Sequence, residues 1–444
     1  MLTKASTIIG TVYQPPIERT TMKHVFAFAI SLFVCVLPLF AAGPSWPMFH
    51  GATGDNFSPE TGLLTVWPED GPKLLWKTDG IGNTEFPGYS TVVVGDGRVY
   101  TTGNVKVGED DKPANAFVFC LDEKTGEILW KYDNGPGWTG HYPGDRSTPT
   151  LDGDCLYAVS AMGRLVCLDA RTGDEIWACQ LLEVYEAKLS TWAHAESVVI
   201  DGDKVIAWPG GKKASVVALD KKTGKTIWET PGSDDVAGYA TALIFEMDGR
   251  RMYANMNQKG LLIVDAQTGE KLLFHEHVTK FDINATIPYY FDGKMLITSG
   301  YGTGSELLQL KLADGKLVAE RIWENKKFDN QHGGIIILDG TVYGAAHNYK
   351  QGIWIAMRLS DGEILWEDRG VGQGCCSFAD GMLYCMGEKS GTVGLVKPSP
   401  EKYEEISRFT LPEGAGMAWA HPVICGKKLF LRRDNVVYCF DIAK

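Results

Sequence analysis

The stretch Leu121-Asp-Glu-Lys-Thr-Gly-Glu-Ile-Leu-Trp130 returns along the chain and decides the fold. Close copies begin at Leu168 and Leu219, and each ends in a tryptophan four residues after its Thr-Gly pair. Weaker copies occupy residues 264–269, 312–315 and 359–366, and degenerate copies begin at residues 395 and 440. Self-similarity at a fixed spacing marks a repeat architecture, so the chain is expected to consist of equal structural units.

A second phrase, an apolar strand that turns on a glycine, precedes each copy of the first. These glycines are separated by 41 to 56 residues, a length that suits one four-stranded propeller blade. Asp-Gly and Asp-x-x-Thr-Gly both predict tight turns, because glycine adopts positive φ without steric cost. The pattern predicts an all-β fold, an eight-bladed β-propeller of four-stranded blades. The eight turn glycines are Gly97, Gly153, Gly202, Gly249, Gly293, Gly340, Gly381 and Gly426.

The two ends of the chain supply complementary parts of one blade. The last repeat, Val436–Asp441, ends before a tryptophan strand can follow, and the missing strand is present in Pro72-Lys-Leu-Leu-Trp-Lys77. Pairing of these terminal strands would close the ring and remove its open edges. The large flat rings of the repeat tryptophans suit them to wedge between blades, which predicts a structural docking role. These residues are Trp76, Trp130, Trp177, Trp228 and Trp366.

The residues before the first repeat predict export. Residues 22–42 have a basic start, an apolar run of about sixteen residues and a small-residue end, which is the layout of a secretory signal peptide. Residues 1–21 are interpreted as an over-called extension, residues 43–72 as a lead-in segment and residues 73–444 as the propeller. The expected location is therefore extracytoplasmic, either periplasmic or secreted, with no stable membrane span after cleavage near Ala42.

Charge and cysteine spacing narrow the classes of partner. The formal charge is −12, and removal of residues 1–42 leaves about −14. Such a surface repels polyanions, so nucleic acid is not expected as a partner, and an anionic membrane is disfavoured. No Cys-x-x-Cys-His occurs, which argues against covalently bound haem c.

The repeat also carries a family resemblance. The pattern Ala-x-Asp-x-x-Thr-Gly-x-x-x-Trp is met in full at Ala218–Trp228, and with Cys in place of Ala at Cys120–Trp130 and Cys167–Trp177. It resembles the tryptophan-docking motif of the PQQ-like (quinoprotein) propeller family, which includes the PQQ-dependent alcohol dehydrogenases and the outer-membrane assembly lipoprotein BamB. The lead-in at Trp46–Gly51 is similar to the start of that superfamily. The resemblance covers residues 46–444 and implies fold far more than activity, because the motif touches no substrate.

The unrepeated segments are expected to contain the ligand-binding or catalytic residues. The Asp-Gly and Thr-Gly turns lie on one face of such a propeller, so the segments from each tryptophan to the next inner strand open on the other face and contain six of the nine histidines. Their polar residues either form a ligand site at the channel mouth or solvate a water-filled channel. In the first case Arg146 and His421 would hold anionic groups, and Trp138 or Trp192 would stack. Glu196 and Asn284 would be oxygen donors suited to Ca²⁺. The candidate set is Trp138, His141, Arg146, Trp192, His194, Glu196, Tyr239, Asn284, His332, Cys375, Cys376 and His421.

Two functions from different classes remain open. The first is a non-catalytic, BamB-like scaffold with a protein or carbohydrate partner, favoured by the short length for a dehydrogenase of this superfamily. The second is an alcohol dehydrogenase, for which the resemblance implies PQQ and Ca²⁺, with Glu196, Asp282 and Asn284 as the residues to test. Adjacent cysteines occur beside the cofactor in several PQQ alcohol dehydrogenases. Here Cys375-Cys376 comes late in the chain, which favours two small strand residues over a strained vicinal disulfide.

Overall fold

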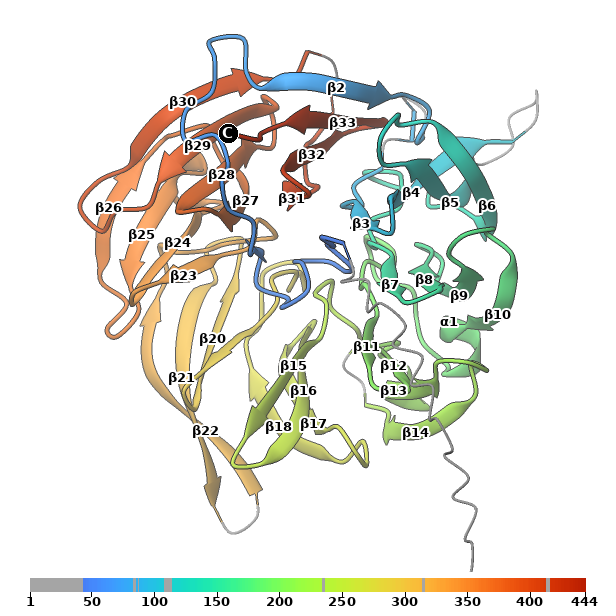
Figure 1. Cartoon of the computed structure of the whole chain (residues 1–444). Coiled ribbons are helices and arrows are strands. Elements are labelled where there is room, and N and C mark those ends of the chain that lie inside the picture. Colours follow the sequence, from blue (N-terminus) through green and yellow to red (C-terminus); the bar gives the residue numbers. More distant parts are fainter. Residues whose placement is uncertain are drawn as a thin grey trace, which may run out of the picture. The chain divides into compact units, whose positions relative to one another are not determined.

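The repeats fold into eight antiparallel sheets of four principal strands, arranged as a ring (Figure 1). The structure, a computed structural model, describes residues 43–82, 85, 86, 88–107, 114–233, 236–313, 316–412 and 416–444. Residues 42–444 form one compact unit. The expected extension and signal peptide, residues 1–42, lie outside the described residues. The prediction of an all-β, eight-bladed β-propeller is confirmed.

Each blade runs from an inner strand at the ring centre to an outer strand at the rim. Blades one to four consist of β3 (Val93–Gly95), β4 (Arg98–Lys106), β5 (Ala114–Asp122) and β6 (Ile128–Pro136); β7 (Thr150–Asp152), β8 (Cys155–Val159), β9 (Arg164–Asp169) and β10 (Glu175–Gln180); β11 (Val199–Asp201), β12 (Lys204–Ala207), β13 (Ala214–Asp220) and β14 (Thr226–Pro231); and β15 (Leu243–Met247), β16 (Arg250–Asn257), β17 (Gly260–Asp265) and β18 (Lys271–Glu276).

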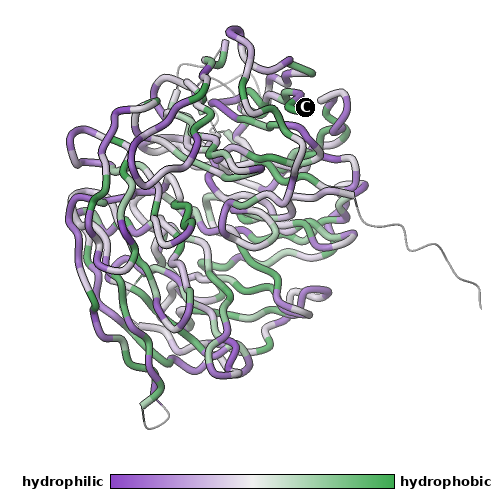
Figure 2. Tube along the Cα trace, turned by 60° about the vertical axis from the view of Figure 1, so that its left-hand side comes forward, coloured by the Kyte–Doolittle hydropathy of each residue, from purple (hydrophilic) through white to green (hydrophobic). Residues whose placement is uncertain are grey.

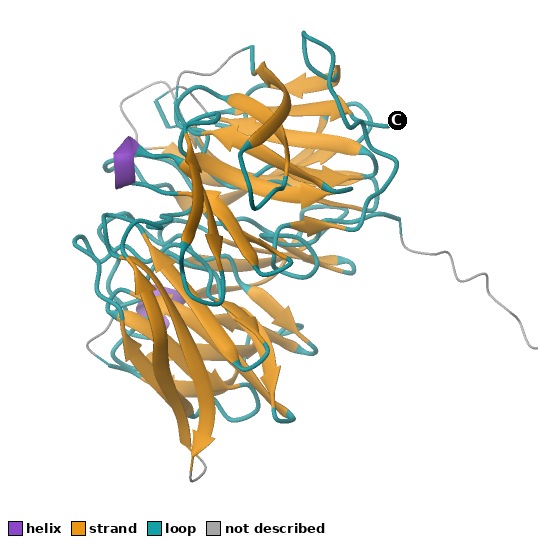
Figure 3. Cartoon of the chain, turned by 90° about the vertical axis from the view of Figure 1, so that its left-hand side faces the viewer, coloured by secondary structure: helices purple, strands orange, loops and turns teal. Residues whose placement is uncertain are grey.

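The remaining blades follow the same order. They consist of β19 (Tyr289–Phe291), β20 (Lys294–Ser299), β21 (Gly304–Ala313) and β22 (Lys316–Asn325); β23 (Ile336–Leu338), β24 (Thr341–Ala345), β25 (Trp354–Arg358) and β26 (Ile364–Asp368); β27 (Gly374–Ala379), β28 (Met382–Gly387), β29 (Thr392–Lys397) and β30 (Glu404–Thr410); and β31 (Val423–Cys425), β32 (Lys428–Arg433), β33 (Val436–Asp441) and β2 (Lys73–Thr78). The described helices are short, α1 (Leu181–Val184) and a 3₁₀ turn at Tyr349–Gln351, so strands and loops dominate the side view (Figure 3).

The N-terminal strand closes the ring, as the sequence predicts. β2 pairs antiparallel with β33, and Trp76 lies opposite Cys439 in the register. The eighth blade therefore takes three strands from the C-terminal end of the chain and one from the N-terminal part. This pairing covers the edge of β33 that an open sheet would expose.

Four repeat tryptophans, Trp76, Trp130, Trp177 and Trp228, pack on the Thr-Gly turn of the following blade, and Trp366 meets the corresponding turn at Ser399. The indole N–H of Trp177 donates to the carbonyl of Lys221 (3.0 Å), and a Cβ added at Gly224 would lie 2.6 Å from the ring. Glycine is needed at this turn for two reasons, its φ of +69° and the ring against its α-carbon. The indoles of Trp76, Trp130 and Trp366 donate likewise to Glu123, Ala170 and Ser399, whereas that of Trp228 packs on Gly269 without a hydrogen-bond partner.

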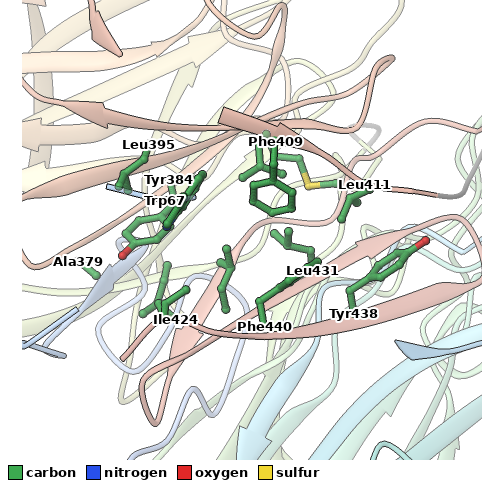
Figure 4. Close-up of a cluster of buried hydrophobic side chains, with 14 of the residues drawn as sticks. Trp67, Ala379, Tyr384, Leu395, Phe409, Leu411, Ile424, Leu431, Tyr438 and Phe440 are labelled. Carbon is green, nitrogen blue, oxygen red and sulfur yellow. The ribbon is translucent and has the colours of Figure 1, made fainter. Parts of the chain in front are cut away.

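The cores lie between neighbouring blades. The hydropathy tube shows apolar residues along the strands and polar residues in the connections (Figure 2). Between the seventh and eighth blades, Tyr384, Phe409 and Phe440 pack with aliphatic residues (Figure 4). Trp67 of the lead-in segment joins this core, with its ring centroid 5.2 Å from that of Phe409. Part of the lead-in is thus built into the propeller.

The rest of the lead-in runs along the inner side of the ring. Trp46 forms an antiparallel bridge with Val94 of the first blade, and β1 (Phe57–Ser58) pairs in parallel with β27 of the seventh blade. β1 is therefore a fifth strand on the inner edge of that blade, which the repeat count did not anticipate. The loop between Trp46 and β1 crosses the channel, and the trace near the ring centre follows this path (Figure 1). It supplies one boundary of the site described next.

Candidate functional site

A cavity of about 500 Å³ opens among the inter-blade connections. Its lining comes from the segments that join each outer strand to the next inner strand, from the turns between second and third strands, and from the lead-in loop. Both kinds of connection lie opposite the Asp-Gly and Thr-Gly turns, because successive strands of a blade alternate in direction. The volume is in the range of small-molecule sites.

The lead-in loop and His421 form a buried layer beside this cavity. The ring centroid of His421 lies 4.7 Å from that of His50 and 5.1 Å from that of Phe49. The Nε2–H of His421 donates to the carbonyl of His332 (2.9 Å), which leaves Nδ1 to accept from the Asn56 amide (3.2 Å). Burial lowers the pKa of His421 to about 4, so its ring is neutral at pH 7. His421 therefore lies at the cavity but is not the cation that the sequence interpretation assigned to it.

Four aromatic rings form a continuous wall. Ring centroids lie 4.4 Å apart between Tyr89 and Trp419, 5.3 Å between Trp419 and Tyr142, and 5.9 Å between Tyr142 and Trp192. The four residues come from four different inter-blade segments, and all four line the cavity. Tilted and edge-to-face contacts at these separations are the favourable geometries for aromatic pairs. The wall therefore holds its own shape and presents apolar ring surface to the cavity.

Arg146 is the prominent cation of this wall. Its guanidinium lies 5.3 Å from the ring centroid of Tyr89 and donates to the carbonyls of Gly144 (3.0 Å) and Tyr142 (2.5 Å). It forms no ion pair with any described carboxylate, and that of neighbouring Asp145 accepts the Ala161 N–H instead (3.1 Å). Burial lowers the pKa of Arg146, although a guanidinium stays charged at pH 7. At least two of its five N–H donors remain for a ligand.

Glu388 is the carboxylate among the lining residues. Its Oε2 accepts from the Trp419 indole (3.1 Å) and from Gln373 (3.4 Å), and lies 3.7 Å from Nε2 of His332. Burial raises the pKa of Glu388 and lowers that of His332 to about 3, so the histidine is neutral at pH 7. Glu388 thus fixes the orientation of Trp419 and offers an acceptor to the cavity.

Five members of the predicted set line the cavity, and seven do not. The lining members are Arg146, Trp192, Tyr239, His332 and His421. The hydroxyl of Tyr239 accepts the backbone N–H of Trp192 (3.3 Å), which links two neighbouring segments. Trp138 folds back on its own loop and donates to the carbonyl of His141 (3.1 Å). His141 is exposed, with its ring centroid 6.1 Å from that of Trp192.

The side chains suggested for Ca²⁺ are buried and form hydrogen bonds within the protein. Glu196 is 1% exposed, and its Oε2 accepts the backbone N–H of Trp208 (2.7 Å). His194 lies behind the cavity lining too, with Nε2 3.7 Å from that oxygen. The Asn284 amide donates to the carbonyl of Asn257 (2.7 Å), and its oxygen accepts from Ser299. Ca²⁺ takes six to eight oxygen ligands, and no cluster of three or more His, Cys, Asp or Glu residues that could hold a metal occurs among the described residues. The residues present do not fit a Ca²⁺ site.

Cys375 and Cys376 are both free thiols in the structure. They are consecutive in β27, and consecutive side chains of a strand point to opposite faces. The sulfur of Cys375 faces the carbonyls of Trp419 and Ala420 at 3.6 Å, whereas Cys376 packs with Leu383 and Cys385. Neither lines the cavity.

Several lining residues lie outside the predicted set, because they belong to turns within the blades and the prediction covered only the segments between blades. Tyr301, His347 and Glu388 lie in the turns between the second and third strands of their blades. Strand alternation alone places these turns on the same face as the inter-blade segments. Tyr301 reaches the cavity because it lies in the turn between β20 and β21.

The comparisons with known proteins agree with this architecture. A family model described as "Outer membrane protein assembly factor BamB" matches residues 114–368, more than half of the chain. The chain belongs to this family. The sequence resemblance to the PQQ-like propellers, BamB included, is thereby confirmed.

Individual relatives divide between two kinds of protein. BamB of Yersinia pestis is 24% identical over 247 residues, covering 54% of this chain and 60% of that protein. The quinohemoprotein alcohol dehydrogenase ADH-IIG of Pseudomonas putida is 30% identical over 148 residues, which are 31% of this chain and only 19% of the enzyme. The chain thus matches about a fifth of the length of that dehydrogenase.

Solved structures show the same fold. The quinohemoprotein alcohol dehydrogenase of Comamonas testosteroni superposes with a TM-score of 0.64 at 14% identity, over 90% of this chain and 81% of that one. BamB of Moraxella catarrhalis gives 0.52 at 18% identity, over 76% and 93%. Within the described residues of this BamB-family propeller, no helix is long and apolar enough to cross a membrane.

Proposed function

We propose that this BamB-family propeller is an exported, non-catalytic binding or assembly scaffold, with its partner bound at the cavity on the loop face. The observation that carries the proposal is the composition of that cavity. Four aromatic rings, amide side chains and one guanidinium without an ion-pair partner among the described residues are groups that recognise a ligand by shape and hydrogen bonding.

The positions of the titratable groups support a binding role. A general base has to come within hydrogen-bond reach of the proton that it removes. Glu196 is buried behind the lining, and the neutral ring of His421 uses both nitrogens inside the protein. Glu388 reaches the cavity but is held by Trp419 and Gln373. These groups stiffen the cavity wall.

Export is part of the proposal and has its own test. The layout of residues 22–42 supports it, and the expected mature chain starts at Gly43. Cell fractionation and mass spectrometry of the chain expressed from Met22 would give the location and the first residue. An unprocessed protein in the cytoplasm would refute export.

The second candidate function is a PQQ-dependent alcohol dehydrogenase, favoured by the match to ADH-IIG and similar enzymes. Purified protein incubated with PQQ and Ca²⁺ should show no quinone absorbance after gel filtration and no dye reduction with short alcohols. A retained quinone band with alcohol-dependent dye reduction would refute the scaffold proposal. The control is a known quinoprotein dehydrogenase treated in parallel.

A further inference from the structure

The chemistry of the cavity points to one class of ligand. We propose that the cavity binds an acidic sugar, a pyranose that carries a carboxylate, such as the uronic acid at the end of a short oligosaccharide. This inference rests on the proposed binding function and specifies its ligand. It follows from the aromatic wall, the unpaired guanidinium, the amide groups and the strained lining residues.

The aromatic wall suits a sugar ring. The rings of Tyr89, Trp419, Tyr142 and Trp192 follow one another at centroid separations of 4.4 to 5.9 Å. Such a surface packs against the C–H face of a pyranose, which is apolar, while the hydroxyls at the sugar's edge point away to polar partners. Because neighbouring rings are tilted by 38° to 61° against one another, they do not form one flat surface, and a bent oligosaccharide fits them better than a flat aromatic ligand.

Arg146 selects the carboxylate. A partly buried guanidinium without an ionised partner is costly, and an anionic ligand would offset that cost. Arginine binds carboxylates through two parallel N–H donors, and Arg146 is held for this by Tyr89 and two backbone carbonyls. The other charged lining groups are Lys389 and Glu388, so the described lining carries a small positive balance on an acidic protein.

Amide side chains supply partners for hydroxyls. Gln331, Asn348, Gln351 and Gln373 all line the cavity, and each amide offers both donors and an acceptor, as a sugar hydroxyl requires. Glu388 adds a further acceptor. The several hydroxyls of a polyol could bond to all four amides, whereas a simple carboxylic acid has too few polar groups to do so.

Three of the lining residues have a strained backbone. Tyr142, Tyr301 and Gln351 all line the cavity and have left-handed φ values of 50°, 60° and 63°. Each such conformation costs about 1 kcal/mol or more for a residue with a side chain, and it persists where the surroundings hold the residue in place. The structure therefore keeps these three side chains on the cavity at an energetic cost, as expected of a preformed binding site.

Overall charge limits the ligand to short chains. The mature protein has a charge of about −14 and repels a long polyanion, although the Debye length of about 8 Å at physiological salt screens distant charges. A single carboxylate in contact with Arg146 is attracted locally. Binding is thus expected for uronate-terminated di- and trisaccharides, and affinity per molecule should not rise with the length of a polyuronate.

The test is calorimetric titration of the purified protein at 0.15 M salt. The probes are a uronic acid-terminated trisaccharide, its neutral hexose analogue and benzoate, a carboxylate on a flat ring. The acidic trisaccharide should bind most tightly. Arg146→Gln should weaken its binding about 10- to 100-fold and change binding of the neutral analogue less than about threefold. Arg146→Lys should recover part of the loss, and Glu388→Gln should weaken both sugars.

Controls keep the outcomes distinct. Arg171→Gln, at an exposed arginine in a Thr-Gly turn, is the matched variant and should bind like the wild type. Equal affinity for acidic and neutral trisaccharides would overturn the role of Arg146 but leave the scaffold proposal intact. Tighter binding of benzoate, or no binding of either sugar, would overturn the sugar class. The PQQ reconstitution decides separately whether the scaffold proposal fails. If Arg146→Gln does not fold, Arg146→Lys and Glu388→Gln carry the comparison.

Discussion

Adding one methyl group at Gly224 tests whether the Trp177 contact, rather than the turn alone, requires glycine. Gly224 has a φ of +69°, and an added Cβ would lie 2.6 Å from a ring carbon of Trp177. Gly202 is the matched control, because its φ is +63° and nothing lies within 4 Å of its added Cβ. Both alanine variants pay for the left-handed backbone, about 1–2 kcal/mol. Gly224→Ala alone also overpacks the ring, which adds about 1–3 kcal/mol.

Urea unfolding followed by circular dichroism measures the difference. We expect Gly224→Ala to lower the free energy of unfolding by about 1–3 kcal/mol more than Gly202→Ala does. Trp177→Leu removes the flat ring, so Gly224→Ala in that background should cost no more than Gly202→Ala, which a double-mutant cycle detects as coupling. Equal destabilisation by the two glycine variants, or additive effects in the cycle, would refute the docking interpretation of the Thr-Gly repeat.

The remaining predictions concern the ring, the buried histidines and the cysteines. Deletion of Leu74–Lys77 removes the strand opposite Cys439, so cooperative unfolding should be lost; a trimmed protein that still unfolds in one sharp transition would contradict ring closure. Burial lowers the pKa of His421 to about 4, below about 6.5 for an unfolded histidine, so its contribution to stability is full above pH 6.5 and is lost as the pH falls toward 4. His421→Gln should therefore flatten the fall in urea midpoint between pH 7 and 4.5, compared with the exposed-site control His141→Gln, and unchanged slopes would refute this. Burial raises the pKa of Cys376 to about 12, so Cys375 and Cys376 should resist alkylation in the native protein and both react after unfolding without reductant; a mass two units lower in that peptide would reveal a disulfide.

The fold was readable from the sequence because its determinants are repeated. Gly224 and Trp177 belong to a pattern that occurs several times, and each copy carries the same physical requirement of positive φ or a docked ring. Even the atypical last repeat was informative, since its missing strand is present at Lys73–Thr78. The fifth strand of the seventh blade, β1, could not be predicted from the sequence, because a strand of two residues is too short to show an alternating pattern.

The candidate site could be predicted only in part. The burial and the hydrogen-bond partners of its side chains differ from one segment to the next and leave no repeated pattern in the sequence. Arg146 and Trp192 line the cavity, on the face where the strand order puts their segments. Glu196 and Asn284 occupy equivalent segments but are buried, and one oxygen of Glu196 and the amide nitrogen of Asn284 bind backbone groups there. Side-chain direction within an irregular segment depends on contacts between blades, and sequence spacing does not report those contacts. Trp419, two residues before His421, shows the same limit, since its role follows from its bond to Glu388.

The pairing of β2 with β33 also fixes the order of events during synthesis. β2 leaves the ribosome among the first segments, and its partner is made more than 350 residues later. Such a distant contact forms late, because loop closure has to precede it. Until β33 emerges, β2 lacks its partner and the ring stays open. Synthesis of β33 is therefore the step that permits ring closure, and a product of translation that stops before β33 lacks the strand that pairs with β2.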